Sequence, residues 1–233
     1  MNIVLFHLNN FFSVSTTSSK YLPIFHQNLL GFVRKVLEIG GPEILEISDE
    51  FGWMPLHYAA HLGNVDAVEL ILKTTSSLAY IKDNQGMSPI HISARNGKSR
   101  ILKRIIEARP DVCELLDIKG RTALHVAVDN GQKKAIKTLL DMTPFDDLIN
   151  EQDLEGNTAL HVAAIHANFE IVVLVALDNR VDKGIVNNME MTAFDIFTES
   201  AIELTQMGMV CTRYHNIIKH LFHLTFSDFL ESD

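Results

Sequence analysis

Histidine recurs in one frame of this chain, and histidine is the side chain most often used for metal binding and acid–base catalysis. Four segments carry it at the same place: GWMPLHYAA, GMSPIHISA, GRTALHVAV and GNTALHVAA. The residues are His57, His91, His125 and His161. A shared metal site would require these imidazoles to converge on one ion, with bonds of about 2.0 to 2.1 Å. Their spacing along the chain decides whether they can.

The four histidines belong to a sequence repeat. The glycines that open the segments lie 34, 34 and 36 residues apart, and the histidines keep the same intervals. An aspartate stands three residues before each glycine, at Asp49, Asp83, Asp117 and Asp153. A period of this length is typical of stacked repeat proteins. Stacking would hold successive histidines about 10 Å apart, which is too far for one metal ion.

Each repeat predicts two short helices that follow a turn. The Asp-x-x-Gly sequence favours a turn, because the carboxylate caps backbone N–H groups and glycine accepts a positive φ. Apolar residues such as Leu56, Ala59 and Ala60 then fit one face of a first helix. The second helix would bury Val68, Ile71 and Leu72; Leu102, Ile105 and Ile106; Ile136, Leu139 and Leu140; and Ile171, Leu174 and Val175.

A second glycine ends the first helix in three repeats, at Gly63, Gly97 and Gly131. The fourth repeat has Ala167 at this position, so we expect its helix end to be less well capped.

The segments TALHVAV and TALHVAA, with the variants SPIHISA and MPLHYAA, resemble the signature of ankyrin repeats, whose period is about 33 residues. The resemblance implies an all-α fold, an ankyrin-repeat solenoid of helix-turn-helix units with β-hairpin tips. It predicts four clear repeats plus degenerate terminal units. We expect an irregular segment over 1–22, a degenerate leading repeat or cap over 23–48, the repeat domain over 49–198, and a C-terminal capping helix and tail over 199–233.

The degenerate units flank the clear repeats. NNMEMTAFDIF keeps Thr192 and Ala193 of the signature but has Asp195 in place of histidine. PIFHQNLLGFVRKVLE, from Pro23, would be an incomplete leading unit. Terminal repeats are expected to be atypical because they cap the stack.

The resemblance implies a structural role for the four histidines. In this family the ring hydrogen-bonds the threonine hydroxyl of its own turn and a backbone group of the neighbouring unit. Thr122 and Thr158 fit this role for His125 and His161, and Ser88 replaces threonine for His91. Met54 has no hydroxyl and cannot play this role, so we expect His57 to be the least anchored of the four histidines. The matching structural glycines are Gly52, Gly86, Gly120 and Gly156.

The resemblance also implies that the chain binds another protein through two strips of each repeat. The hairpin tips would contribute Glu50, Phe51, Trp53, Asn84, Gln85, Met87, Ile118, Lys119, Arg121, Leu154, Glu155 and Asn157. The ends of the first helices would contribute His61, Leu62, Arg95, Asn96, Asp129, Asn130, Ile165 and His166. We expect Trp53, Phe51, Met87 and Arg121 to be anchors, because exposed aromatic, methionine and arginine side chains dominate interfaces.

A narrower resemblance concerns the longer segments AYIKDNQGMSPIHISARNG and INEQDLEGNTALHVAAIHANFEIVVLVALDNRVDKGIVNN. They look like plant ankyrin proteins of the accelerated-cell-death type, which combine ankyrin repeats with a C-terminal membrane domain. This similarity implies an adaptor in plant defence or stress signalling. The alternative is a truncated product of a membrane-anchored ankyrin signalling protein.

Composition limits the other functions. A net charge of -9 argues against nucleic-acid binding. Two cysteines favour a reducing interior and a cytoplasmic location. The tail from Ile202 to Leu230 carries Glu203, Arg213 and Lys219, which oppose membrane insertion. We therefore expect recruitment to the cytosolic face of a membrane only through partners.

No catalytic sequence motif is present, and we expect neither an enzyme, a cofactor, a metal nor a small-molecule ligand. NGKS, at Asn96, lacks the first glycine of a phosphate-binding loop. One alternative remains in the tail, where Cys211, His215, His220 and His223 offer metal-binding side chains for a metal-binding or enzymatic function. An amphipathic capping helix is the simpler interpretation of that segment.

Overall fold

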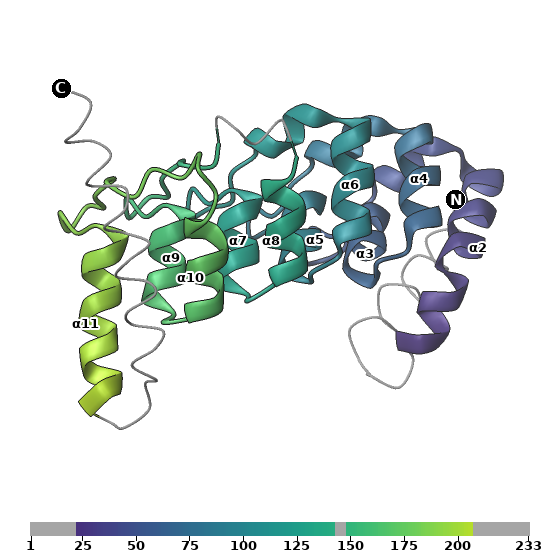
Figure 1. Cartoon of the computed structure of the whole chain (residues 1–233). Coiled ribbons are helices and arrows are strands. Elements are labelled where there is room, and N and C mark those ends of the chain that lie inside the picture. The colour runs from purple at the N-terminus through teal and green to yellow at the C-terminus, as the bar shows by residue number, and fades with distance from the viewer. Residues whose placement is uncertain (1–21, 143–147, 207–233) are drawn as a thin grey trace. The chain divides into compact units, whose positions relative to one another are not determined.

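The computed structural model of this 233-residue chain describes residues 22–142 and 148–206 (Figure 1). The chain divides into two compact units, Met1–Asp117 and Ile118–Asp233, called unit 1 and unit 2 below. The regular elements of the described residues are helices, which confirms the all-α class. The β-hairpin tips are turns in this structure, and the β-pairing seen in these residues is one isolated antiparallel bridge between Val186 and Thr192.

Unit 1 holds two complete helix pairs and the helix that precedes them. The first pair is α3 (Pro55–Leu62) with α4 (Val65–Thr74), and the second is α5 (Pro89–Arg95) with α6 (Ser99–Ala108). Helix α2 (Leu22–Gly40) precedes them and packs against α4 and α3. Short 3-10 helices follow α2, α4 and α6: η1 (Pro42–Glu46), η2 (Ser76–Tyr80) and η3 (Pro110–Glu114).

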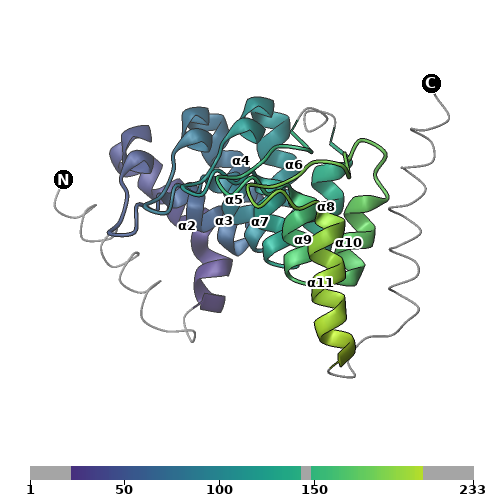
Figure 2. The same cartoon turned by 90° about the vertical axis from the view of Figure 1, so that its left-hand side faces the viewer.

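Unit 2 repeats the arrangement with α7 (Ala123–Asp129) and α8 (Lys133–Leu140), then α9 (Ala159–Ile165) and α10 (Phe169–Ala176). A longer helix, α11 (Ala193–Gln206), follows. Helix α7 packs against α8 and α9, while α9 also packs against α10 and α11 (Figure 2). Each helix therefore covers the apolar side of its neighbours, as stacked repeats require.

The second helices form because their apolar residues fall on one side at helical spacing. In α6, Ile101, Leu102, Ile105 and Ile106 are buried while the charged residues between them face solvent. Full burial of such a side chain stabilises the fold by about 1.5 to 3 kcal/mol. In α10 the buried residues are Ile171, Val172, Val175 and Ala176. The prediction of Leu174 in this core was wrong: it is half-buried, and Val172 takes its place.

The two terminal helices correspond to halves of a repeat. Helix α2 is followed by η1 just as α4 is followed by η2, so α2 occupies the place of a second helix. Helix α11 begins after a turn that matches the other turns, so it occupies the place of a first helix. The ring of Phe197 is buried edge-on against Phe169, 5.3 Å between centroids, and holds α11 to α10. The domain boundaries remain a prediction; α11 runs across the one proposed after residue 198.

The turns that contain Asp49, Asp83 and Asp153 are held by the carboxylate of that aspartate. The Asp153 carboxylate accepts hydrogen bonds from the N–H groups of Glu155 and Asn157, both at 2.9 Å. Asn187 does the same in the fifth turn, where its Oδ1 accepts from the N–H groups of Met189 and Met191. The fifth unit therefore keeps the turn although its sequence has lost the aspartate.

Glycine is required in these turns because consecutive turns touch. Gly156 has φ 76°, and a Cβ placed on it would lie 2.7 Å from the backbone nitrogen of Asn188 in the next turn. A Cβ at Gly52 would lie 2.9 Å from the nitrogen of Asn84. Both the left-handed backbone and the close contact exclude a side chain.

The histidines bridge consecutive turns in unit 2. The Thr122 hydroxyl lies 2.8 Å from His125 Nδ1, and the Thr122 N–H donates to the same nitrogen. Because Nδ1 accepts, the ring proton is on Nε2, which donates to the carbonyl oxygen of Asn157 at 2.9 Å. His161 repeats the bridge, from Thr158 to the carbonyl oxygen of Met191 at 3.1 Å.

His57 lacks half of this bridge. Its Nδ1 accepts only from the N–H of Met54, which has no hydroxyl, and its buried Nε2 has no hydrogen-bond partner among the described residues. Burial lowers the pKa of His57 below its usual value, and burial likewise lowers the pKa of His161. Both rings are therefore held in the neutral form that the bridge requires.

The bridges predict unequal effects of histidine substitution. His125→Ala and His161→Ala should each lower the free energy of unfolding by about 1 to 3 kcal/mol, because each strands buried hydrogen-bonding groups. His57→Ala should lower it by less, since fewer partners are lost. Chemical denaturation of the three variants measures the difference. Equal losses at the three positions would show that the hydroxyl and the neighbouring carbonyl contribute nothing.

The end of α9 differs from the other first helices. Gly63, Gly97 and Gly131 have φ between 65° and 77°, and Ala167 adopts the same left-handed backbone with φ 47°. The hydrogen bond that closes this turn, from Asn168 N–H to Ala163 O, measures 3.4 Å, whereas its equivalent from Gln132 to Ala127 measures 2.9 Å. The turn that ends α9 is therefore formed, but the hydrogen bond that closes it is longer.

Exchanging alanine and glycine at this position should have opposite effects. Ala167→Gly should raise the free energy of unfolding by about 0.5 to 1 kcal/mol, because the left-handed backbone costs an L-residue about 1 to 2 kcal/mol. Gly131→Ala is the matched reverse substitution and should lower the free energy of unfolding. Gly131 has the same left-handed backbone, with φ 68°, and no atom lies within 4 Å of the added Cβ to clash with it. Thermal and urea unfolding of both variants measure the effect. Destabilisation by Ala167→Gly would contradict it.

Candidate functional site

The hairpin tips of each unit are joined by backbone hydrogen bonds. In unit 2 the Leu154 N–H donates to the carbonyl oxygen of Lys119, and the Asn188 N–H donates to that of Glu155, both at 3.0 Å. In unit 1 the Asn84 N–H donates to the carbonyl oxygen of Phe51 at 3.1 Å. The tips are therefore fixed in position before any partner binds.

Large apolar side chains are exposed on these tips. Leu154 is 72% exposed and Ile118 is 65% exposed in unit 2, and Phe51 is 50% exposed in unit 1. Met189, at the fifth tip, is 68% exposed and was missed by the sequence analysis. The sequence could have predicted this, because aligning Asn187 and Thr192 with the aspartate and threonine of the earlier turns places Met189 on the tip.

The hydrophilic tip residues expected at the surface are there. Glu50, Asn84, Gln85, Lys119 and Glu155 are exposed. The Asn84 amide also donates to the carbonyl oxygen of Glu50 at 2.9 Å. The exposed tips therefore combine apolar side chains with polar ones of both charges.

Trp53 is not the free anchor that the sequence suggested. It is half-buried, and its indole N–H donates to the Asp83 carboxylate at 2.9 Å. Its ring centroid lies 5.0 Å from that of Tyr58 and 5.5 Å from that of His61. Trp53 is thus part of the packing between two turns and the first helix.

Three predicted contact residues are buried, so the expectation that they face a partner was wrong. Met87 is 3% exposed, Leu62 is 7% exposed and Asn157 is 2% exposed. The Asn157 amide oxygen accepts a hydrogen bond from the Asn187 amide at 2.9 Å. These side chains fill the space between consecutive repeats.

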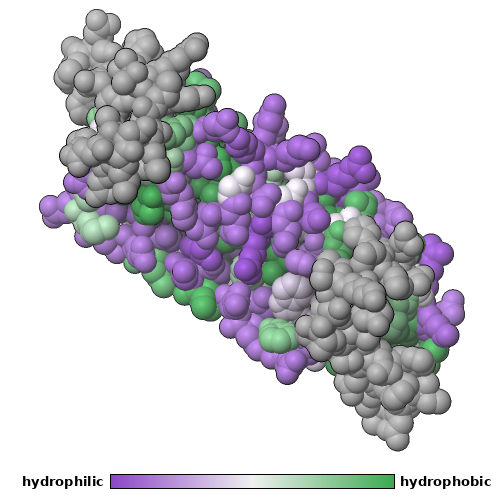
Figure 3. All heavy atoms as spheres, turned by 90° about the horizontal axis from the view of Figure 1, so that it is seen from below, coloured by the Kyte–Doolittle hydropathy of each residue, from purple (hydrophilic) through white to green (hydrophobic). Residues whose placement is uncertain are grey.

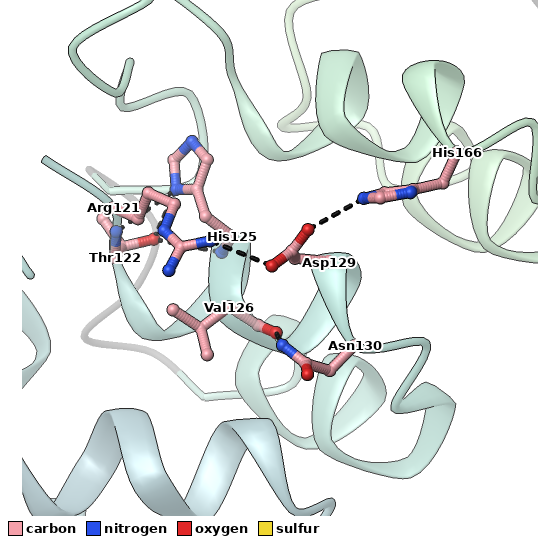
Figure 4. A network of polar contacts seen from close by, with 7 residues as sticks. All are labelled: Arg121, Thr122, His125, Val126, Asp129, Asn130 and His166. Carbon is pink, nitrogen blue, oxygen red and sulfur yellow. Dashed lines mark hydrogen bonds and ion pairs between the residues drawn. The ribbon is translucent and has the colours of Figure 1, made fainter. Parts of the chain in front are cut away.

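Arg121, Asp129 and His166 form one polar network in unit 2 (Figure 4). Arg121 Nη1 lies 2.9 Å from one Asp129 oxygen, and His166 Nε2 lies 2.8 Å from the other. Arg121 is only 17% exposed. The structure thus brings together three predicted contact residues, but Arg121 is engaged within the chain and is not the exposed anchor expected.

The other first-helix ends lie at the surface in both units. Arg95, Asn130, Ile165 and His166 are exposed, while His61 and Asn96 are half-buried. The amides of Asn96 and Asn130 donate to carbonyl oxygens one helical turn back, in Ile92 and Val126. Figure 3 shows one face of the molecule, where most of the visible described surface is hydrophilic.

The described residues include histidine, cysteine, aspartate and glutamate side chains, which are the types used for metal binding. They contain no group of three or more histidine, cysteine, aspartate or glutamate side chains placed to hold a metal ion. Burial raises the pKa of the Cys113 thiol to about 12, so this cysteine is no nucleophile at neutral pH. The tail candidates Cys211, His215, His220 and His223 lie outside the described residues.

The part of the chain that the structure describes has no helix with the length and apolar character needed to cross a membrane.

The packing of Trp53 and the exposure of Phe51 predict different effects of two aromatic substitutions. Trp53→Ala should lower the free energy of unfolding by about 2 kcal/mol, because it removes ring contacts and strands Asp83. Phe51→Ala, two residues away, should change it by less than about 0.5 kcal/mol. Urea denaturation of the two variants is the measurement. A Trp53→Ala protein as stable as the parent would mean that these contacts are unimportant.

The comparison with known families agrees with this architecture. A family model described as ankyrin repeats, in three copies, matches residues 26–114 and again residues 94–187. Together these matches cover more than half of the chain and include the helix pairs of both units. A comparison with curated proteins gives no match. The repeated turn, helix pair and histidine bridge, together with the family match, show that the chain belongs to the ankyrin-repeat family.

Proposed function

We propose that this chain is a non-catalytic module that binds another protein through the exposed tips of its repeats. Ankyrin repeats are in general protein–protein interaction modules. The observation that supports the tips as the contact surface is the exposure of Ile118, Leu154 and Met189 on consecutive turns of unit 2. Exposed apolar side chains on consecutive fixed turns, called the apolar row below, are typical of binding surfaces.

The energetic reason is preorganisation. A flexible loop would lose conformational entropy on binding, whereas these tips are already hydrogen-bonded to one another. Leu154 is also held by its contact with Gly120. Both its Cγ and its backbone nitrogen would lie 3.1 Å from a Cβ added at Gly120. Burying two or three such side chains in a partner supplies the apolar anchors that dominate interface energy.

Capture of a partner tests this proposal. Ile118→Ser with Leu154→Ser should remove most of the protein that the parent chain captures from a cell extract, because the apolar row is lost. Leu177→Ser is the matched control, since Leu177 is 60% exposed but lies at the end of α10, away from the tips. Circular dichroism and the melting temperature establish that the variants are folded.

Capture that survives in the double variant, or that is lost equally in the Leu177 variant, would contradict the assignment of the tips as the contact surface.

For the cellular role, we propose an adaptor in plant defence or stress signalling. The support is the similarity of the repeat segments, among them INEQDLEGNTALHVAA, to plant ankyrin proteins of the accelerated-cell-death type. We further propose that the adaptor works in the cytoplasm and reaches the cytosolic face of a membrane through partner proteins.

A further inference from the structure

A basic cluster lies where α3 and α5 end in unit 1. We define the basic cluster as His61, Arg95 and Lys98. His61 and Arg95 are in the last turns of α3 and α5, and Lys98 immediately precedes α6. The methylene stem of Lys98 extends over the end of α3, with Cδ 3.0 Å from a Cβ added at Gly63. The side chain of Lys98 therefore reaches from its own repeat to the preceding one.

Arg95 and Lys98 carry the positive charge of the basic cluster. Arg95 and Lys98 form no ion pair with any described residue. By contrast, Arg104 contacts both Glu69 of α4 and Glu107 of α6. The pKa of His61 is lowered, first by burial and then by the charges of Lys98 and Arg95. The cluster thus concentrates uncompensated positive charge on a chain whose net charge is -9.

An aromatic side chain, Trp53, borders the basic cluster. The ring of Trp53 is tilted against the His61 ring, with 5.5 Å between centroids, and Trp53 is in turn held by Tyr58 and Asp83. The His61 imidazole therefore lies against the Trp53 indole, close enough to Lys98 and Arg95 for their charges to lower its pKa. Such a surface can accept an anionic group and, beside it, an apolar one.

From this arrangement we infer that the basic cluster binds an acidic side chain of a peptide segment in a protein partner. The carboxylate lies between the Arg95 guanidinium and the Lys98 ammonium, and the adjoining apolar part of the segment rests against Trp53. This inference adds a second contact surface to the proposed protein-binding function and rests on that function. It concerns the helix ends of unit 1, whereas the proposed function was assigned to the tips of unit 2.

Charge complementarity favours an acidic peptide segment as the ligand of the basic cluster. Two cationic side chains beside a ring that burial keeps neutral match one or two carboxylates, and arginine binds a carboxylate with two parallel hydrogen bonds. A nucleic acid is disfavoured because its many phosphates would be repelled by the rest of a chain with net charge -9. An acidic peptide contacts only the small region where the charge is positive.

Binding of short peptides to the full chain tests the inference. The probes are a fluorescently labelled acetylated peptide with three glutamates between two leucines, its glutamine counterpart, and a counterpart with phosphoserine. Fluorescence anisotropy gives the affinities. Trp53 is the single tryptophan of the chain, so a change in its emission reports binding beside His61. The glutamate peptide should bind about ten-fold more tightly than the glutamine peptide, and added salt should reduce the difference.

Charge-removing variants locate the contact. Arg95→Gln and Lys98→Gln should each weaken binding of the glutamate peptide about three- to five-fold. Lys103→Gln is the matched control, because Lys103 is an exposed cation in the middle of α6 and should leave binding unchanged.

Equal affinity for the glutamate and glutamine peptides, binding of the phosphoserine peptide alone, or equal loss in the Lys103 variant would overturn the inference. None of these results depends on the capture experiment, because the peptides report on unit 1 alone. Capture that survives in the Ile118/Leu154 double variant, together with unchanged peptide binding, would refute the tips as the contact surface without affecting the basic cluster.

Discussion

A neutral imidazole that accepts at Nδ1 and donates at Nε2 determines how closely consecutive repeats can approach within a unit. His125 accepts from the hydroxyl and the N–H of Thr122 and donates to the carbonyl oxygen of Asn157. The equivalent bridge from His161 to the carbonyl oxygen of Met191 joins the next two turns, which lie so close that Gly156 has no room for a side chain. The glycine, the threonine and the histidine of the signature therefore all serve the same structural requirement, which is the close spacing between turns.

The same constraint explains how the fifth unit of the stack differs. Asp195 takes the place of histidine and accepts hydrogen bonds from the hydroxyl and the N–H of Thr192, at 2.6 and 2.9 Å. A carboxylate thus preserves the bond within its own turn. An ionised carboxylate has no proton to donate to the carbonyl oxygen of a following turn. The change from histidine to aspartate therefore keeps the start of α11 and removes the group that would bridge to another repeat.

The sequence predicted the features that depend on one repeat at a time. The period, the capping aspartates, the two helices and the Thr–His pairs all follow from residues close together in the chain. It failed where the environment comes from the next repeat. Met87 and Asn157 look like tip residues, yet they are buried between repeats. Trp53 looks free in sequence but meets Asp83 of the next repeat, thirty residues later. Arg121 was missed for a different reason, because its partner Asp129 lies in the same repeat, at the far end of the first helix. No local pattern reports such partners.

Recognition must therefore be carried by the few positions that the bridge and the core leave free. In every repeat the turn, the glycine and the histidine are committed to stacking, so their identity carries no information about a partner. The side chains of the tips and of the first-helix ends differ between repeats: Leu154 is apolar where Asn84 is polar, and Arg95 is basic where Asp129 is acidic. Because the backbone beneath them is repeated, these differences alter the chemistry of the surface without altering the fold. One chain can thus combine an apolar row on the tips of one unit with a cationic cluster at the helix ends of the other, and each can change independently of the histidine bridges.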